Sequence, residues 1–177
     1  VLEELCGLGL ERAIRVGTCG ALAAALALED LVIADEALAC DGTSRALGAG
    51  ERVAADRALV AALVAVQSSS PGSGAHVGAV ATSDLFYDPH PARARAWEGA
   101  GALAVEMEAA TLLQVGSRRG IRVACLLAVS DVFDADGARR RLDADGLVRA
   151  GERLGRVAAA ALGAPVAAAG RAPRASG

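Results

Sequence analysis

The sequence has very few aromatic residues and no lysine. Phe, Tyr and Trp make up 2% of the 177 residues, so a hydrophobic core must be built from Ala, Val and Leu, whose small side chains let helices approach a sheet closely. All 18 basic residues are Arg, so an anion site must rely on guanidinium groups and backbone amides. The net charge is −3 and no basic patch is interleaved with aromatics, so nucleic acid is not an expected partner.

Paired cysteines, a signal peptide and long apolar runs are also missing. The four cysteines form no CxxC pair, and neither histidine lies near one of them in the sequence. We therefore expect reduced thiols in a cytoplasmic protein, with no metal and no disulfide framework. The first residues carry acids and lack the basic segment of a signal peptide. No apolar run approaches the roughly 20 residues that span a bilayer, so no membrane partner is expected.

Apolar residues are abundant and their runs alternate in type. They make up 54% of the chain, and the length suffices for one domain with a core. Strand-like runs alternate with helix-like runs, which predicts an α/β fold with a mainly parallel or mixed sheet. We place this domain at residues 1–162 and expect a disordered tail at 163–177. The expected strands are 13–16, 31–39, 77–81, 103–105 and 123–129, and the expected helices are 1–10, 56–66, 91–97, 109–119 and about 143–162, with a surface loop at 41–50.

A glycine-containing segment follows the first expected strand and is expected to close it as a turn. It reads Arg15-Val-Gly-Thr-Cys-Gly20. Its small residues let the backbone approach an anion, Thr18 offers a hydroxyl group and Arg15 supplies a positive charge. On this segment alone, a plain turn with no ligand is the more common outcome.

Two carboxylates surround the only methionine in Glu106-Met107-Glu108. In an extended segment both glutamates lie on one face, where two carboxylates and a thioether are suited to clamp a sugar. The alternative is the acidic N-terminus of a helix, where negative charge is favourable.

Asp131 follows Ser130 at the end of the apolar run 123–129. Ligands in open α/β sheets bind at the carboxyl ends of strands, and a carboxyl group withdrawn from water can hold and donate a proton. The alternative role for Asp131 is a cap or a turn.

Phe86 offers a ring that can stack on a flat ligand or pack in the core. The run 139–141, three arginines, is most simply a solvated charge cluster.

Taken in order, four segments resemble the nucleoside phosphorylase family of the hexameric purine and uridine type. They are IRVGTCGAL at 14–22, ATSDLFYDP at 81–89, AVEMEAATLL at 104–113 and LLAVSDVF at 126–133. In that order they are similar to the family's phosphate-binding strand, base-stacking segment, ribose-binding signature and strand with the catalytic aspartate. The resemblance covers residues 1 to about 162 and implies a three-layer α/β/α fold with a mixed central sheet.

The resemblance implies roles for the residues that would hold phosphate and ribose. Arg15 and Thr18 would contact phosphate. Met107 and Glu108 would hold the ribose, Glu108 through its hydroxyl groups, with Glu106 beside them.

The resemblance also implies roles around the base. Cys19 and Gly20 would line the base and ribose pocket, and Phe86 would pack against the base. Ser130 would face the purine, and Asp131 would act as the general acid that protonates N7. The implied reaction is phosphorolysis of purine nucleosides to free base and ribose 1-phosphate, with inorganic phosphate as co-substrate and no cofactor.

Several alternatives stay open within the family. Uridine members resemble an Asn-Arg pair where this chain has Ser130 and Asp131, so the pair favours a purine, whereas ATLL at 110–113 is more like uridine members. Related nucleosidases generally lack an arginine at the position of Arg15. A uridine phosphorylase, a nucleosidase relative and an inactive nucleoside-binding fragment therefore remain as alternatives. In the family an arginine near the last helix assists the aspartate, and the loop length does not decide among the three arginines at 139–141.

The chain departs from the family at its start. The family's first strands, with a Gly-Asp-Pro phosphate turn and a further phosphate arginine, have no counterpart before Val1. We expect an N-terminally truncated domain that exposes one flank of the sheet and has weak or no activity alone. Family members are hexamers built from dimers, so a homo-oligomer is expected.

Overall fold

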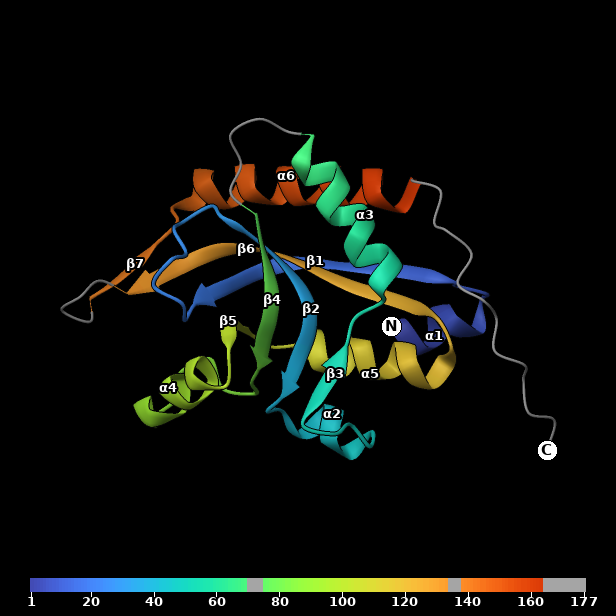
Figure 1. The fold of residues 1–177 in the computed structure, drawn as a ribbon, viewed down its shortest axis with the longest axis horizontal. Helices are drawn as coiled ribbons and strands as arrows, with labels where there is room; N and C mark the ends of the chain where they lie inside the picture. The colour runs from blue at the N-terminus through green and yellow to red at the C-terminus, as the bar shows by residue number, and fades with distance from the viewer. Residues whose placement is uncertain (70–74, 134–137, 164–177) are drawn as a thin grey trace.

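The computed structural model describes residues 1–69, 75–133 and 138–163, and Figure 1 shows their arrangement. The helices are α1 (Leu2–Gly7), α2 (Gly42–Ala46), α3 (Arg57–Ser68), α4 (Pro91–Gly99), α5 (Ala109–Arg119) and α6 (Ala144–Gly163). The strands are β1 (Arg12–Ala21), β2 (Leu31–Ala39), β3 (Arg52–Ala54), β4 (Ala75–Thr82), β5 (Ala102–Glu106), β6 (Arg122–Phe133) and β7 (Arg139–Arg141). Except for Gly163, which ends α6, the expected tail lies outside the described residues.

The strands form one mixed sheet in the order β3-β2-β4-β5-β1-β6-β7. The β1–β6, β2–β4 and β4–β5 pairs are parallel, whereas β1–β5, β2–β3 and β6–β7 are antiparallel. An additional antiparallel pairing joins β6 to β2, so that β2, β4, β5, β1 and β6 close a ring. The sheet is therefore mixed, as expected, but closed where an open sheet was assumed. β6 is buried from Val123 to Val132, as its apolar run predicted.

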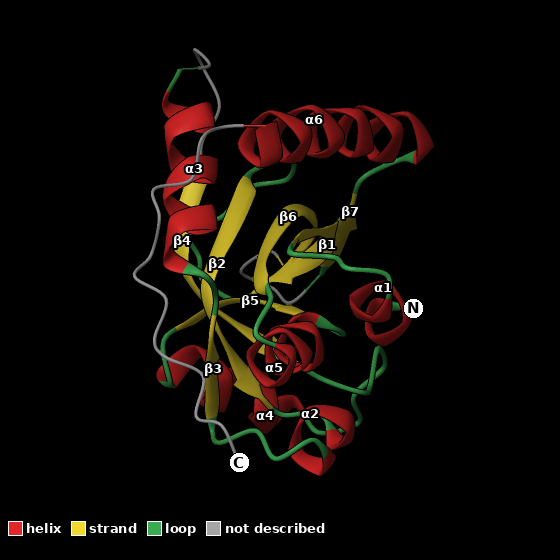
Figure 2. Cartoon of the chain, turned by 90° about the vertical axis from the view of Figure 1, so that its right-hand side faces the viewer, coloured by secondary structure: helices red, strands yellow, loops and turns green. Residues whose placement is uncertain are grey.

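Helices cover both faces of the sheet, as Figure 2 shows. Side chains alternate along β2 with the period of two that a strand imposes. Leu31 and Ile33 pack in a cluster with residues of α3 and α6, whereas Val32 and Ala34 pack in a cluster with residues of α5. The predicted three-layer α/β/α architecture is confirmed.

Small side chains set the spacing between the layers. A Cβ atom on Gly116 of α5 would lie 2.5 Å from Cγ2 of Val123 in β6, which is closer than real contacts allow. Glycine at this position therefore lets α5 lie directly on β6.

Two boundaries near the N-terminus differ from the prediction. Residues 17–20, expected as a turn, lie within β1. Thr18 is aligned with Ala128 of β6, and the parallel ladder between these strands holds the segment extended. α1 ends at Gly7 rather than at residue 10, and Gly9 beyond it takes a φ of +90°, which is incompatible with a right-handed helix.

The expected loop at 41–50 contains the short helix α2. Asp41 is its N-cap, and Oδ2 of Asp41 accepts a hydrogen bond from the backbone N–H of Ser44 at 2.7 Å. Thr111 Oγ1 of α5 donates to the same oxygen at 2.8 Å, so this buried carboxylate ties α2 to α5. Asp is among the preferred N-caps, but a five-residue helix is too short to show a periodic pattern. The same reason explains why the three-residue strands β3 and β7 were not expected.

Candidate functional site

The strands converge on one cleft of about 440 Å³. It lies where the carboxyl ends of β1, β5 and β6 meet the segment after β4 and the short strand β7. All the residues predicted to bind phosphate, ribose or base line this cleft; they are Arg15, Thr18, Cys19, Gly20, Phe86, Glu106, Met107, Glu108, Ser130 and Asp131. The fold therefore brings together residues that are more than a hundred positions apart in the sequence.

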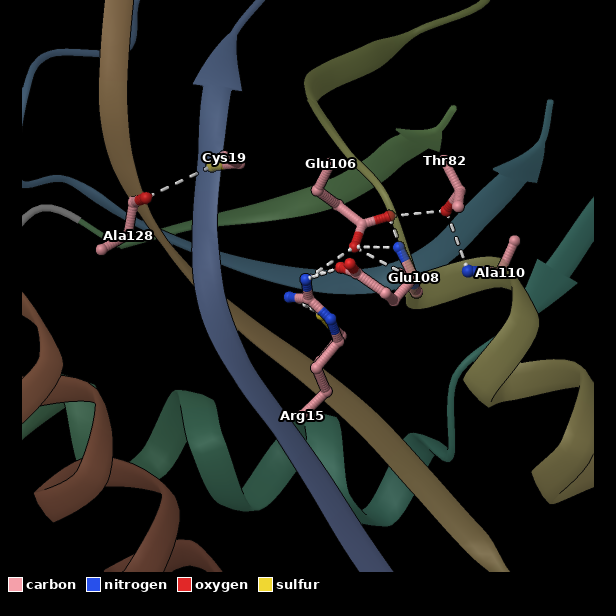
Figure 3. A network of polar contacts seen from close by, with 9 residues as sticks. Arg15, Cys19, Thr82, Glu106, Glu108, Ala110 and Ala128 are labelled. Atoms are coloured by element: carbon pink, nitrogen blue, oxygen red, sulfur yellow. Dashed lines mark hydrogen bonds and ion pairs between the residues drawn. The ribbon is translucent and has the colours of Figure 1, made fainter. Parts of the chain in front are cut away.

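At one end of the cleft, the guanidinium of an arginine faces two carboxylates (Figure 3). The guanidinium of Arg15 forms an ion pair with Glu108, and its Nη2 lies 3.3 Å from Oε2 of Glu106. Burial lowers the pKa of Arg15, but the neighbouring thiol and carboxylates outweigh burial and leave that pKa raised. Arg15 is thus a permanent cation whose charge Glu106 and Glu108 partly neutralise.

Gly17 makes room for this guanidinium. A Cβ atom at position 17 would lie 2.6 Å from Nη1 of Arg15 and 3.1 Å from its Cζ. The absence of a side chain at Gly17 lets the Arg15 side chain lie along β1, with its guanidinium near Glu106 and Glu108. Gly17 therefore provides space for the Arg15 side chain within strand β1. It does not form the turn that was expected.

Glu106 is buried at the floor of the same region, and its side chain is 0% exposed. Its Oε1 accepts hydrogen bonds from Thr82 Oγ1 at 2.6 Å and from the backbone N–H of Ala109 at 3.0 Å. Its Oε2 accepts from the backbone N–H groups of Glu108 and Ala109, each at 2.9 Å. These N–H groups belong to the start of α5, where free donors and the helix dipole favour a carboxylate. Both oxygens of Glu106 are thus occupied by the protein.

Glu108 and Met107 are placed differently from Glu106. Glu108 is the N-cap residue of α5 but makes no side-chain capping bond, and its side chain is 56% exposed. Met107 is partly exposed and lines the cleft. Glu106 ends β5 whereas Glu108 begins the helix, so the expectation of two glutamates on one extended face does not hold. The alternative interpretation, an acidic helix N-terminus, describes the backbone at Glu108 better. The side chains of Glu106 and Glu108 nevertheless both contact Arg15.

The other end of the cleft holds Asp131, which is buried. Oδ1 of Asp131 accepts a hydrogen bond from Nε of Arg139 at 2.8 Å, and Nε of Arg141 lies 2.7 Å from the same oxygen in an ion pair. Its Oδ2 accepts from Ser130 Oγ at 2.6 Å, and Ser130 Oγ also lies 3.3 Å from the carbonyl oxygen of Cys19. The arginines at 139 and 141 are therefore ion-pair partners of Asp131, which corrects their interpretation as a solvated charge cluster.

An aromatic ring adjoins this carboxylate. Cζ of Arg139 lies 5.0 Å from the centroid of the Phe86 ring, and Cζ of Arg141 lies 5.8 Å from it. Both distances are in the range of cation–π attraction. Tyr87 packs edge-on against Phe86 with ring centroids 4.9 Å apart. Phe86 is half exposed, so it lies at the cleft and not in the core.

The remaining predicted residues come from β1. Thr18 is exposed and Gly20 is half-buried, and both line the cleft. The thiol of Cys19 is buried and donates to the carbonyl oxygen of Ala128, with Sγ 3.6 Å from that oxygen. Burial raises the pKa of the Cys19 thiol, so it stays protonated at neutral pH. Cys125 on β6 is likewise buried, and burial raises its pKa to about 12.

Sequence reasoning missed Thr82 and did not decide among the three arginines of β7. Thr82 lies in the motif at 81–89, but nothing in that motif marks its role, because that role depends on its alignment with Glu106 across β4 and β5. The pairing of Asp131 with Arg141 across β6 and β7 was equally invisible along the chain.

Within the described residues, no three His, Cys, Asp or Glu side chains are gathered as a metal ion would require. No helix in that part of the chain is long and apolar enough to cross a membrane.

Comparison with known proteins places this cleft in a family. A guanosine phosphorylase of Halorubrum lacusprofundi is 34% identical over 145 residues, which cover 81% of this chain and 59% of that protein. DeoD-type purine nucleoside phosphorylases of Shewanella amazonensis and Colwellia psychrerythraea are 38% and 36% identical over 125 residues, 70% of this chain. The alignments cover 52% and 53% of those two proteins, so the chain spans between half and three fifths of these relatives.

The family match extends beyond these pairwise alignments. The family model described as "Phosphorylase superfamily" matches residues 1–163. These residues contain every strand and helix described above and every residue that lines the cleft. The match therefore does not rest on one motif but on the whole layered domain with its site. On these grounds, the chain belongs to the phosphorylase superfamily.

Proposed function

We propose that this chain carries the site of an enzyme that splits purine nucleosides with phosphate into free base and ribose 1-phosphate, with Asp131 as the general acid. The observation that carries the proposal is the layout of one cleft. At one end, the cation Arg15 lies beside Glu108, an exposed carboxylate that can accept from ribose hydroxyl groups. At the other end lies a buried acid, Asp131. The names of the relatives support a purine or guanosine substrate and phosphate as its partner.

Each end of the cleft has chemistry suited to one part of such a substrate. A guanidinium and a hydroxyl group, from Arg15 and Thr18, can donate hydrogen bonds to phosphate oxygens. The exposed carboxylate of Glu108 can accept hydrogen bonds from a sugar diol, with the thioether of Met107 against the ring. Phe86 offers its ring to the base.

In the proposed reaction, a phosphate oxygen forms a bond to C1′ while the bond from C1′ to the purine N9 breaks. The bonding electrons pass to the purine. Asp131, which accepts hydrogen bonds on both of its oxygens, first takes up a proton from water and then transfers it to N7. Protonation makes the purine a better leaving group. Asp131 becomes a carboxylate as the proton leaves, and the guanidinium groups of Arg139 and Arg141 stabilise that negative charge. A pyrimidine has no N7, so this arrangement favours a purine.

The experiment is a substrate comparison in this chain and in any longer protein that contains it. Inosine, uridine and methylthioadenosine are supplied with and without phosphate, and released base is measured. We expect phosphate-dependent release of hypoxanthine from inosine, weak in this chain alone, and a rate about a hundredfold lower in Asp131→Ala. Release of base without phosphate would indicate a nucleosidase, and a preference for uridine would indicate a uridine phosphorylase.

Two outcomes would contradict the proposal more directly. An unchanged inosine rate in Asp131→Ala would show that Asp131 is not the acid. Calorimetric binding of inosine and phosphate with no turnover, even in a longer protein, would leave only a nucleoside-binding fragment. Phosphorolysis without added cofactor is expected, since phosphate supplies the nucleophile.

We also propose that the protein assembles as a homo-oligomer, as the family resemblance implies. Light scattering on the purified chain measures the assembly state. A monomer at the concentrations used for activity would contradict this part of the proposal, without affecting the assignment of the cleft.

A further inference from the structure

Thr82 is a buried hydroxyl group at the end of β4, behind the cleft (Figure 3). Its Oγ1 donates to Oε1 of Glu106 at 2.6 Å and accepts from the backbone N–H of Ala110 at 2.9 Å. Since a hydroxyl group has one proton to donate, the donation to Glu106 and the acceptance from Ala110 define its orientation. Thr82 thus connects the carboxylate of Glu106 to the first turn of α5.

Thr82 and Glu106 together satisfy the start of α5. The backbone N–H groups of Glu108 and Ala109 bond to Glu106, and that of Ala110 bonds to Thr82. A helix N-terminus leaves four such groups without partners in the helix. Three of them are therefore held by two side chains from neighbouring strands. This arrangement locks the carboxylate of Glu106 in one place and orientation.

The locked carboxylate faces Arg15. Oε2 of Glu106 lies 3.3 Å from Nη2 of Arg15, and a buried carboxylate with 0% exposure requires such a counter-charge. The second partner of Arg15, Glu108, is largely exposed and is not held by a capping bond. Glu106 is thus the stationary partner of the arginine, and Glu108 is the movable one.

We infer that Thr82 is a positioning residue for the phosphate site, which acts through Glu106 to hold the guanidinium of Arg15. In this assignment Glu106 is a support and not a ribose ligand, because both of its oxygens are already occupied. The inference rests on the proposed function in that it takes phosphate as the anion that Arg15 binds. It adds to that function a residue that does not touch the substrate.

The test measures the affinity of inorganic phosphate alone by calorimetry on the 177-residue chain. Thr82→Val keeps the shape of the side chain and removes the hydroxyl group. We expect phosphate affinity to fall about tenfold, which corresponds to about 1.4 kcal/mol. Thr82→Ser restores the hydroxyl group and should restore the affinity. A purely structural role for Thr82 would lower the melting temperature without this loss and recovery of affinity.

Thr111→Val is the matched control. Thr111 lies on the same helix, and its hydroxyl group bonds to Asp41, away from the cleft. This variant should lower the melting temperature and leave phosphate affinity unchanged. An unchanged phosphate affinity in folded Thr82→Val, or no recovery in Thr82→Ser, would overturn the inference.

A second variant keeps the inference testable if Thr82→Val does not fold. Glu106→Gln retains the volume of the side chain and removes the charge that holds Arg15, so phosphate affinity should again fall. Unchanged affinity in Glu106→Gln would overturn the inference, as would absence of phosphate binding by the unsubstituted chain. Phosphate binding with the expected pattern but no cleavage of inosine in any longer protein would count against the proposed function only.

Discussion

The guanidinium of Arg15 is paired with the carboxylate of Glu108, so the proposed phosphate ligand and the proposed ribose ligand partly neutralise each other. The two carboxylates that contact Arg15 differ in exposure, because the Glu106 side chain is fully buried whereas the Glu108 side chain is 56% exposed. Glu108 can therefore swing away while Glu106 stays. Phosphate at Arg15 would release Glu108 to accept the ribose hydroxyl groups, which couples the binding of the two substrates.

This exchange predicts that Glu108→Gln binds phosphate more tightly than the unsubstituted chain. Removing the carboxylate frees Arg15 from a competing anion. For an ion pair with one largely exposed partner, we expect a gain of roughly two- to fivefold. Calorimetry with inorganic phosphate measures the change. Glu152→Gln on α6, which removes the same charge from the surface pair with Arg156, is the control. Weaker or equal binding of phosphate by Glu108→Gln would rule out the exchange.

Gly17→Ala tests the space that Arg15 occupies. The new Cβ atom would lie 2.6 Å from Nη1 of Arg15, and the flexible arginine can move away more easily than the strand can. We expect a melting temperature within a few degrees of the original and phosphate affinity reduced several-fold. These are measured by thermal unfolding and calorimetry.

Gly116→Ala is the matched control for that glycine. Its Cβ atom would lie 2.5 Å from Cγ2 and 3.1 Å from Cβ of Val123, and 3.3 Å from the backbone carbonyl oxygen of Ile121 just before β6. Overpacking of this kind costs about 1–3 kcal/mol, with no reason for phosphate affinity to change in the folded protein. The prediction fails if Gly17→Ala destabilises the fold as much as Gly116→Ala does, or if its phosphate affinity is unchanged.

The two arginines on Asp131 are expected to contribute unequally to phosphorolysis. Both Nε and Nη2 of Arg139 lie 2.8 Å from Oδ1 of Asp131, and Arg139 lies closer to the ring of Phe86 than Arg141 does. Arg141 is also the more exposed of the two. We expect Arg139→Ala to lower kcat/KM for inosine about tenfold, as loss of a hydrogen bond to a charged group implies, and Arg141→Ala to lower it less. Equal or reversed effects in steady-state kinetics would contradict this ranking.

Buried thiols make the free energy of unfolding depend on pH in the alkaline range. Burial raises the pKa of Cys125 from its ordinary value of 9.0 to about 12. Between these values the unfolded chain loses this proton and the folded protein keeps it, so the free energy of unfolding falls as pH rises. Below pH 8 the thiol is protonated in both states and contributes no dependence.

Urea unfolding at several pH values tests this linkage. Cys125→Ala should show a smaller loss of stability between pH 8.5 and 10.5 than the unsubstituted chain, by up to about 2 kcal/mol at the upper end. A residual slope is expected from Cys19, whose pKa burial also raises. Cys6→Ala, which removes a partly exposed thiol, serves as the control. Identical pH profiles for Cys125→Ala and the unsubstituted chain would contradict the prediction.

Much of the fold was predictable because its strands and helices are periodic and bounded by clear breakers. The strand at 31–39 and the helix at 109–119 have the predicted bounds, since each is a continuous pattern, and Gly120 ends the helix in a left-handed conformation. The short elements α2, β3 and β7 were not predictable, because three to five residues carry no period. The closure of the sheet by β2 and β6 depends on strand pairing between distant segments, which no local pattern encodes.

The sequence by itself determined the family, the layered α/β architecture and the set of residues that share the cleft. It did so because four segments resemble the family's motifs in the same order, and the family match covers residues 1–163. Only the tertiary structure decided how these residues are paired. Arg15 meets Glu108, Asp131 meets Arg139 and Arg141, and Thr82 meets Glu106, because these contacts form between strands that are adjacent in space and distant in the chain.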